Sequence, residues 1–431
     1  MKASFYNLHF DYKDRKFIYN TLSTSLIAID EKTSENLEKS KVELIDKDIL
    51  CQLEKQGMVV DNNLDETVVY ETFYNEMQYC GIKDELRLVF IPTYNCNLKC
   101  VYCFEECSTC KPINLTDIDQ IVKFVQKQLA ANLRYRKLSI VLFGGEPLIC
   151  FNECIYLCQS LSLLAQQNEI EFVTKISTNS LLITPDVIKK LFIPYKMRIQ
   201  ITLDGGKAYH NKRRVYRDGK GTYSQILDSI RLLNYYGIKN EIDLRINVDK
   251  NNIESVEEVL NDVHSKVGYV YIGLLRAVGN NKEHISDCIS DNDYVLKYRP
   301  KLEPIFKKYG KKIHYGDFGK KHSCALNSGN SYIIDSNLDV YRCDNLVGNP
   351  KYSIGKIIDG VLHKTSEYYN QRTWSPFKFE KCKQCKRLPA CAASCAFLCL
   401  LKNGSMNVPT CYITEEQLIE KVKQYISRYE F

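Results

Sequence analysis

Between residues 86 and 290, short apolar runs alternate with longer stretches in which apolar residues recur every three or four positions. The short runs predict six strands and the longer stretches predict helices between them. This order predicts a parallel sheet with right-handed crossovers, curled into a partial (β/α)6 barrel of the TIM type. The predicted strands cover residues 86–91, 139–143, 174–178, 198–202, 244–248 and 269–273, and the predicted helices cover 117–129, 185–191, 223–236 and 253–263.

The two flanks of this barrel region have different patterns. Residues 1–85 predict a small α+β domain, with strands at 5–10 and 16–20 and helices at 33–44 and 47–56. Residues 291–320 predict a bridging helical segment. The regular alternation is lost after residue 320, so residues 321–431 predict a loop-rich domain that folds around metal rather than around an apolar core.

The composition fits a globular protein of several domains. Of 431 residues, 45% are hydrophobic and 26% are charged, and the net charge is +7. A chain of this length predicts two or three domains. We identify no apolar run long enough to cross a bilayer and no secretion signal at the N-terminus, which favours a cytoplasmic protein without a membrane partner. The modest charge, without an arginine-rich arm, does not favour a nucleic-acid partner.

Cysteine is the unusual component of this sequence. The chain has 19 cysteines, and 13 of them lie in two groups, at residues 96–110 and 324–411. A disulfide scaffold is typical of short secreted chains, and an odd count leaves one thiol unpaired. Closely spaced cysteines in a long chain without a signal sequence more often bind metal. The pattern therefore predicts a metalloprotein.

The first group begins directly after the first predicted barrel strand. Cys96, Cys100 and Cys103 have the spacing C-x3-C-x2-C. Three thiolates on one loop can hold three corners of a [4Fe–4S] cluster and leave the fourth iron open to a substrate. Zinc is the alternative, but it needs a fourth ligand and usually takes paired C-x2-C units.

This segment resembles the signature of the radical S-adenosylmethionine superfamily, with Tyr102 as the aromatic residue before the third cysteine. The resemblance implies that the open iron binds the amino and carboxylate groups of S-adenosylmethionine. Reductive cleavage then gives a 5′-deoxyadenosyl radical that abstracts a hydrogen atom. It also implies an external electron donor such as flavodoxin or ferredoxin.

Further motifs at the predicted strand ends match the same family. Gly144, Gly145, Glu146 and Pro147 resemble its GGEP element, which binds the methionine amino group. Ser177 and Asn179 match positions that bond the ribose or carboxylate, Arg245 matches an arginine that pairs with the carboxylate, and Ser180 stands where many members have glycine. Residues 202–205 resemble the S-x-D-G strand end. Residues 210–214 resemble an H-x-x-R stretch near the substrate, although a solvated run of charges explains them equally well.

Other cysteines of the barrel region have plainer interpretations. Cys107 and Cys110 form an extra C-x2-C, for which free thiols are the default and a redox pair is the alternative. Cys150, Cys154 and Cys158 share one helical face, which favours a buried stripe over a set of ligands.

The second cysteine group contains C-x2-C-x5-C-x3-C, which alone is compatible with zinc. Together with its flanking cysteines it resembles the SPASM extension, which holds two auxiliary [4Fe–4S] clusters. By this resemblance Cys324, Cys343 and Cys395 bind the first auxiliary cluster, whose fourth iron is open or takes another residue such as Cys399 or Cys288. Leu338 departs from the usual glycine. Cys382, Cys385, Cys391 and Cys411 bind the second auxiliary cluster.

SPASM enzymes mostly modify peptides or proteins, and residues 1–85 resemble the leader-binding elements of peptide maturases. The resemblance implies a maturase of a ribosomally made, cysteine-containing precursor peptide with a leader. Its most favoured product is a sulfur-to-carbon thioether, as in sactipeptides or ranthipeptides, with carbon–carbon crosslinking as an alternative.

Two further hypotheses differ in kind. An anaerobic sulfatase maturase would oxidise Cys or Ser to formylglycine, with Asp344 after Cys343 as the catalytic base. A zinc-rich binding protein would carry out no chemistry at all.

Overall fold

The computed structural model describes residues 1–431 except 81–83, 104, 106–110, 277–285, 314–323 and 430–431. Cys107 and Cys110 lie outside the described residues. The chain divides into two compact units. The first contains residues 1–81, 315–327 and 373–431, and the second contains residues 82–314 and 328–372.

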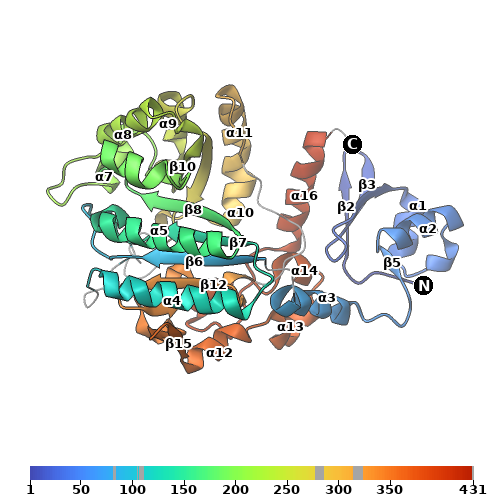
Figure 1. Ribbon diagram of the computed structural model, residues 1–431. Coiled ribbons are helices and arrows are strands. Elements are labelled where there is room, and N and C mark those ends of the chain that lie inside the picture. The colour runs from blue at the N-terminus through green and yellow to red at the C-terminus, as the bar shows by residue number, and fades with distance from the viewer. Residues whose placement is uncertain (81–83, 104, 106–110, 277–285, 314–323, 430–431) are drawn as a thin grey trace. The chain divides into compact units, whose positions relative to one another are not determined.

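The second unit is built on a ten-stranded sheet in the order β11-β10-β9-β8-β7-β6-β12-β13-β14-β15. Its first six strands are parallel neighbours in sequence order, as the hydrophobic pattern predicts. The partial barrel is therefore confirmed (Figure 1). These strands are β6 (Glu85–Ile91), β7 (Lys137–Leu142), β8 (Glu171–Thr178), β9 (Arg198–Leu203), β10 (Ile242–Val248) and β11 (Tyr269–Leu274).

Amphipathic helices cover one face of this sheet and form its core. Helix α4 begins after Asn114, whose side chain caps it by accepting a hydrogen bond from the backbone N–H of Asp117 at 2.9 Å. Its apolar residues join those of the strands and of the other helices in one buried cluster. The helices are α4 (Leu115–Ala131), α5 (Phe151–Gln167), α6 (Pro185–Val187), α7 (Lys207–Arg213), α8 (Tyr223–Tyr235), α9 (Val256–Val263), α10 (Asp291–Asp293) and α11 (Arg299–Lys308).

Helix α5 and the turn before it correct one statement drawn from the sequence. Residues 147–167 are long and apolar enough to cross a membrane by length and composition alone. Cys154, Leu157, Cys158 and Leu161 of this helix are fully buried in the core of the sheet unit. The stripe of cysteines is thus part of the packing, and the apolar length serves a core helix.

Four more strands extend the sheet in a stretch for which the sequence predicts loops. Strand β12 (Ser331–Asp335) pairs in parallel with β6, and β13 (Asp339–Tyr341), β14 (Gly355–Ile358) and β15 (Val361–Lys364) follow in antiparallel order. All five residues of β12 are buried. A strand buried on both faces loses the alternation by which strands are predicted, so this one was not found.

The first unit combines the N-terminal residues with the second cysteine group. Strands β2 (Asn7–Tyr12), β3 (Arg15–Asn20) and β4 (Leu26–Ile29) form an antiparallel sheet in that order, and β1 (Lys2–Ala3) pairs with β5 (Val59–Val60). The helices are α1 (Glu31–Glu38), α2 (Lys47–Lys55) and α3 (Glu66–Asn75). The small α+β fold expected from residues 1–85 is present, with β4 and α3 in addition.

The cysteine-rich end of the chain has an apolar core as well. Leu8, Phe17 and Tyr19 of the N-terminal sheet pack with Ile413 and with Leu418, Val422 and Ile426 of α16. The prediction that this segment lacks an apolar core is therefore wrong, because α16 supplies one. The helices here are α12 (Ser366–Arg372), which belongs to the sheet unit, and α13 (Glu380–Lys383), α14 (Leu388–Cys391), α15 (Ala396–Asn403) and α16 (Glu415–Tyr429).

Candidate active site

Cys96, Cys100 and Cys103 of the first cysteine group lie on the loop that follows β6. The Cys103 backbone N–H donates to the Cys100 carbonyl at 3.1 Å, and the Leu98 N–H donates to Cys96 Sγ at 3.4 Å. Burial raises the pKa of the Cys103 thiol to about 12, and the charges of Cys100 and Cys96 contribute to that rise. The three thiols are therefore close enough to interact, as one shared site requires.

Two glycines let the turn after β7 lie directly on this cysteine loop. The Gly145 N–H donates to the Thr93 carbonyl at 3.1 Å, and the Glu146 N–H donates to the Asn95 carbonyl at 2.9 Å. A Cβ atom on Gly145 would lie 2.3 Å from the Asn95 carbonyl oxygen. Gly144 has φ +117°, a conformation that favours glycine. The two glycines thus position the backbone from which Cys96 starts.

Glu146 is fully buried and bonds to the end of the next strand. Its Oε1 accepts hydrogen bonds from the Thr178 hydroxyl at 2.8 Å and the Leu148 N–H at 3.1 Å. Its Oε2 accepts from the Asn179 N–H at 2.8 Å. Burial raises the pKa of this carboxyl, and the three hydrogen bonds oppose the rise. Glu146 therefore joins the ends of β7 and β8.

Asn179 connects the end of β8 to the cysteine loop. Its Nδ2 donates to Asn97 Oδ1 at 2.6 Å and lies 3.7 Å from Cys96 Sγ. Its Oδ1 accepts from the Leu181 N–H at 3.0 Å, which fixes the orientation of the amide. The sequence did not identify Asn97, because an asparagine between two cysteines has no signal of its own.

The opposite side of the cysteine loop pairs with residues 213–217. The Lys99 N–H donates to the Val215 carbonyl at 2.8 Å, and the Val101 N–H donates to the Arg213 carbonyl at 3.0 Å. Arg217 donates through Nε and Nη2 to the Cys96 carbonyl, at 3.2 and 3.1 Å. The loop is therefore held by backbone hydrogen bonds from both sides.

Tyr102 links the cysteine loop to the interior of the barrel. Its hydroxyl accepts from Arg214 Nη1 at 2.9 Å and from Asn247 Nδ2 at 3.2 Å. Asn247 Oδ1 in turn accepts from Arg245 Nε at 2.7 Å. Gly273 makes room for this pair, since a Cβ there would lie 2.4 Å from Arg245 Nε. Asn247 is a site residue that the sequence did not predict, and Arg214 entered only as part of the H-x-x-R resemblance of residues 210–214.

Buried charges surround this chain of contacts. Asp204, at the end of β9, is fully buried, and its carboxylate interacts with the Tyr102 hydroxyl. Burial raises its pKa, whereas the guanidinium of Arg214 opposes the rise. Burial likewise raises the pKa of the Cys100 thiol, and Arg214 opposes that rise too. Arg214 is thus a cation shared by Asp204 and the cysteine loop.

Ser177 faces the interior of the barrel with other polar residues. Its Oγ accepts from Gln200 Nε2 at 3.0 Å, and Gln200 Oε1 accepts from the Tyr271 hydroxyl at 2.6 Å. Alternate residues of the same strands, such as Ile176 and Ile201, are buried under the helices. The sheet therefore has one apolar face and one polar face, and Arg245 lies on the polar one.

His210 is a structural residue rather than part of a solvated run. It is fully buried, its Nδ1 accepts from the Asp204 N–H at 3.2 Å, and its Nε2 lies 3.0 Å from the Thr222 hydroxyl. The Thr222 hydroxyl donates to the Arg214 carbonyl, so Nε2 carries the ring proton. Burial lowers the pKa of His210 to about 3. This neutral imidazole supports the backbone around Asp204 and Arg214.

Asp344, the predicted catalytic base, lies in the same unit as the barrel. It is exposed at the first position of a short 3-10 turn, Asp344–Leu346. Burial raises the pKa of Glu105 to about 8, and the charges of Asp344 and Glu146 contribute to the rise. Glu105 is thus within electrostatic range of both Asp344 and Glu146. The role of Asp344 as a base stays a prediction.

The arrangement around the cysteine loop fits a [4Fe–4S] cluster with S-adenosylmethionine. Three thiols share one loop, an amide donor stands beside Cys96, and Arg214 lies beside Cys100. A polar barrel face continues from this loop through Asn247 to Arg245. Cys96, Cys100 and Cys103 would hold the cluster, and Arg245 with Ser177 would face the cofactor.

Four cysteines of the second group line one cavity of about 370 Å³ in the first unit: Cys382, Cys385, Cys391 and Cys411. They are the four that the SPASM resemblance assigns to one cluster. Burial raises the pKa of Cys391 to about 12, and the charges of Cys382 and Cys385 contribute. Among the described residues, no three His, Cys, Asp or Glu side chains converge on a single ion. Ligands of a four-iron cluster bind different irons and need no such convergence.

The other four cysteines of this group are divided between the units. Cys324 and Cys395 belong to the first unit, where their charges interact, and Cys343 belongs to the second. Cys399 is buried on α15, one turn after Cys395, and its Sγ lies 3.5 Å from the Ala393 carbonyl. The assignment of these cysteines to one cluster stays a prediction.

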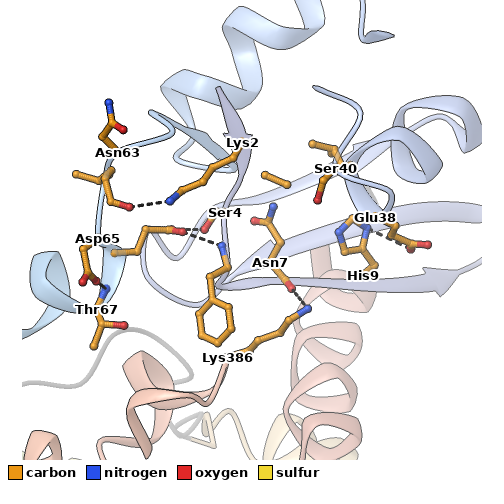
Figure 2. A pocket seen from close by; sticks show the side chains of 15 residues that line it. Lys2, Ser4, Asn7, His9, Glu38, Ser40, Asn63, Asp65, Thr67 and Lys386 are labelled. Carbon is orange, nitrogen blue, oxygen red and sulfur yellow. Dashed lines mark hydrogen bonds and ion pairs between the residues drawn. The ribbon is translucent and has the colours of Figure 1, made fainter. Parts of the chain in front are cut away.

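The N-terminal residues form a second cavity, of about 680 Å³, beside strand β2 (Figure 2). Its floor contains Ser4, whose hydroxyl donates to Glu66, and Asn7, whose Nδ2 donates to the Met58 carbonyl at 2.8 Å. Lys2 and Lys386 each donate to one backbone carbonyl, those of Leu64 and Asn7. An ammonium has three donors, so both lysines retain donors for a bound partner.

Comparisons with known proteins agree with this geometry. Residues 90–263 match the model of the Radical SAM superfamily. The chain is 26% identical over 329 residues to a cysteine-type anaerobic sulfatase-maturating enzyme of Clostridium novyi (strain NT), which covers 70% of this chain and 85% of that protein. It is 21% identical over 327 residues to a serine-type anaerobic sulfatase-maturating enzyme of Klebsiella pneumoniae, covering 70% and 78%.

Two solved structures share the fold. Native anSMEcpe with bound AdoMet and Cp18Cys peptide has a TM-score of 0.61 at 22% identity, and the match covers 80% of this chain and 97% of that one. Streptococcus suis SuiB bound to precursor peptide SuiA has a TM-score of 0.57 at 17% identity, covering 95% and 98%. The matched family segment runs from β6 to α9 and contains the cysteine loop, the double-glycine turn and the polar barrel face. Residues 90–263 therefore match the Radical SAM superfamily, and the chain is similar to enzymes of this kind over 70% of its length.

Proposed function

We propose that this enzyme is a maturase that modifies a ribosomally made, cysteine-containing precursor peptide, and that its product is a sulfur-to-carbon thioether. The observation that carries the proposal is the small α+β fold that the N-terminal residues form before β6. The likeness to peptide-bound SuiB extends over 95% of this chain, whereas the likeness to anSMEcpe covers 80%. A domain added to the shared barrel is a natural place for recognition of a leader.

The cofactors follow from the family and from the cysteine pattern. The family implies S-adenosylmethionine and one [4Fe–4S] cluster, and we propose two auxiliary clusters in addition. When bound, S-adenosylmethionine and the first cluster would supply a 5′-deoxyadenosyl radical that removes a hydrogen atom. The auxiliary clusters would supply a site for the electron that remains when sulfur and carbon join. Cys96, Cys100 and Cys103 would bind the first cluster, and the SPASM-like segment would bind the others.

The N-terminal sheet supports leader recognition in our proposal. Strand β2 is at the edge of its sheet, and an edge strand offers unpaired backbone groups to an added strand. The cavity beside β2 has spare donors on Lys2 and Lys386, which suit an acidic side chain of the leader. The Thr21 hydroxyl donates to the Lys386 carbonyl at 2.6 Å, so the sheet is bonded to the cysteine segment.

Mass spectrometry of a co-expressed peptide tests the proposal. A suitable candidate would be a peptide from any short, cysteine-containing reading frame found beside the gene. A thioether removes two hydrogens, one from a carbon and one from a thiol, and leaves one cysteine unable to react with iodoacetamide. An unmodified peptide, or a loss of two hydrogens with every thiol still reactive, would contradict the thioether. The latter result would indicate a carbon–carbon crosslink.

Formylglycine formation is the second candidate, and the curated relatives favour it. Both named relatives are sulfatase-maturating enzymes. Asp344 follows Cys343 as a base would in our prediction, and the proton on a substrate thiol or hydroxyl would pass to its carboxylate. A sulfatase peptide in which the target cysteine loses its sulfur would establish this reaction. The Asp344→Asn variant should then lose product formation and retain 5′-deoxyadenosine release.

A further inference from the structure

The cavity of the second cysteine group is lined by a half-buried cationic side chain. Arg387 lines this cavity together with the four cysteines. Its side chain is half-buried, whereas Lys381 and Lys386, which line the same cavity, are exposed. The charge of an exposed lysine is screened by water and salt, and the charge of a half-buried guanidinium is screened less. Arg387 is therefore the cation that acts on the cavity most strongly.

Arg387 is fixed beside the cysteines by its neighbours in the chain. Its carbonyl accepts from the Cys391 N–H at 2.8 Å at the start of α14. Its Nη1 donates to the carbonyl of Ile413, two residues after Cys411. The guanidinium thus connects the two segments that carry Cys391 and Cys411, and it retains further N–H donors for a partner in the cavity.

The cavity also contains a group of the opposite charge. The carboxylate of Glu415 lines the same cavity and has the opposite effect on any negative group there.

We propose that Arg387 sets the reduction potential of the second auxiliary cluster by serving as its counter-cation. One-electron reduction adds a negative charge to a cluster that four thiolates already make negative. A fixed positive charge stabilises the reduced form more than the oxidised form, so it raises the potential and favours uptake of the electron. This inference rests on the proposed assignment of Cys382, Cys385, Cys391 and Cys411 to one cluster.

Potentiometric titration of the anaerobically purified holoenzyme with dithionite, followed by electron paramagnetic resonance, tests this role. The Arg387→Gln variant should shift the midpoint potential of one cluster to a more negative value and leave the other clusters unchanged. Lys381→Gln removes an exposed charge from the same cavity and should shift it little. Glu415→Gln removes the carboxylate and should shift it to a more positive value.

An unchanged midpoint in Arg387→Gln with full iron content would overturn the proposal. If that variant loses iron, the potential of Arg387→Lys tests the proposal instead. The flexible lysine ammonium reaches solvent, so the midpoint potential of this variant should be below that of the wild type. A potential equal to or above the wild-type value would then contradict the role. Failure of the cluster assignment would appear differently, as an iron content that Cys382→Ala does not lower.

Discussion

Replacing Gly145 with alanine tests whether the double-glycine turn positions the cysteine loop. A Cβ atom at this position would lie 2.3 Å from the Asn95 carbonyl oxygen and 2.5 Å from that of Tyr94. Ordinary contacts begin at 3.4 Å, so the two backbones must separate by about 1 Å. The φ angle of Gly145 is not positive, so alanine brings steric overlap without a strained backbone.

The expected loss can be estimated from what the separation breaks. A shift of about 1 Å disrupts the hydrogen bonds from the Gly145 N–H to the Thr93 carbonyl and from the Glu146 N–H to the Asn95 carbonyl. Each such bond contributes about 1 kcal/mol, and overpacking costs roughly 1–3 kcal/mol. We therefore expect a loss of roughly 3–5 kcal/mol in the stability of the barrel. Misplacement of the cysteine loop by about 1 Å should slow the reaction roughly 100-fold.

Three measurements on anaerobically reconstituted protein check this expectation. They are the iron content, the rate at which 5′-deoxyadenosine forms in dithionite, and the melting temperature. Gly329→Ala is the matched control, because its φ is not positive and the nearest atom is the flexible end of Arg372 at 3.3 Å. A Gly145→Ala variant with the rate and melting temperature of the wild type would refute the positioning role.

Three further substitutions probe the same unit by thermal unfolding. Ser180→Ala should raise stability by about 1–3 kcal/mol, because the Ser180 hydroxyl is fully buried and has no hydrogen-bond partner among the described residues; a lower melting temperature would reveal a partner. Leu338 has φ +64°, which favours glycine, but its side chain is buried in the core. Leu338→Gly should therefore lower the stability by about 2 kcal/mol, because the lost packing exceeds the relieved strain; a rise in stability would contradict this. Burial, with Asp339 adding, raises the pKa of Asp335 from 3.8 to about 6. The folded state therefore favours the protonated acid, and stability is lost as pH rises from 3.8 to about 6. Asp335→Asn should remove that loss, so its gain over the wild type should grow towards about 3 kcal/mol by pH 7; a gain independent of pH would contradict this.

The barrel could be predicted because its signal is local. Each strand is a short apolar run and each helix has its own periodicity, so the alternation is visible without knowledge of contacts. Strand β12 was missed because all five of its residues are buried, which removes the alternation. The apolar run at residues 147–167 was not identified from the sequence, and its length alone would not distinguish a core helix from a membrane span.

The site could be predicted only where residues follow one another in a motif. Arg214 and Asn247 bind the Tyr102 hydroxyl from 112 and 145 residues away along the chain. No local pattern marks such contacts, because they depend on how the strand ends converge. By the family resemblance, Ser180 and Leu338 stand where other members have glycine. The structure gives the reason for that glycine, since both residues have positive φ. The resemblance could not show that the Ser180 hydroxyl has no partner among the residues that the structure describes, or that the Leu338 side chain packs in the core.

Glu146 shows how a residue assigned to the cofactor also maintains the fold. A carboxylate can accept about four hydrogen bonds, and three are already taken by Thr178, Leu148 and Asn179. At most one remains for an ammonium group of the cofactor, so backbone carbonyls must supply the others. In Glu146→Gln, an NH2 group replaces one of the two carboxylate oxygens. In either orientation this NH2 group faces a donor that bonds to the carboxylate in the wild type, so a hydrogen bond is lost. We therefore expect the melting temperature of the protein without cofactor to fall, by an amount that reflects a loss of about 1–3 kcal/mol. A residue reserved for the cofactor would leave that temperature unchanged and would lower only the affinity for S-adenosylmethionine, so the two measurements separate the two roles.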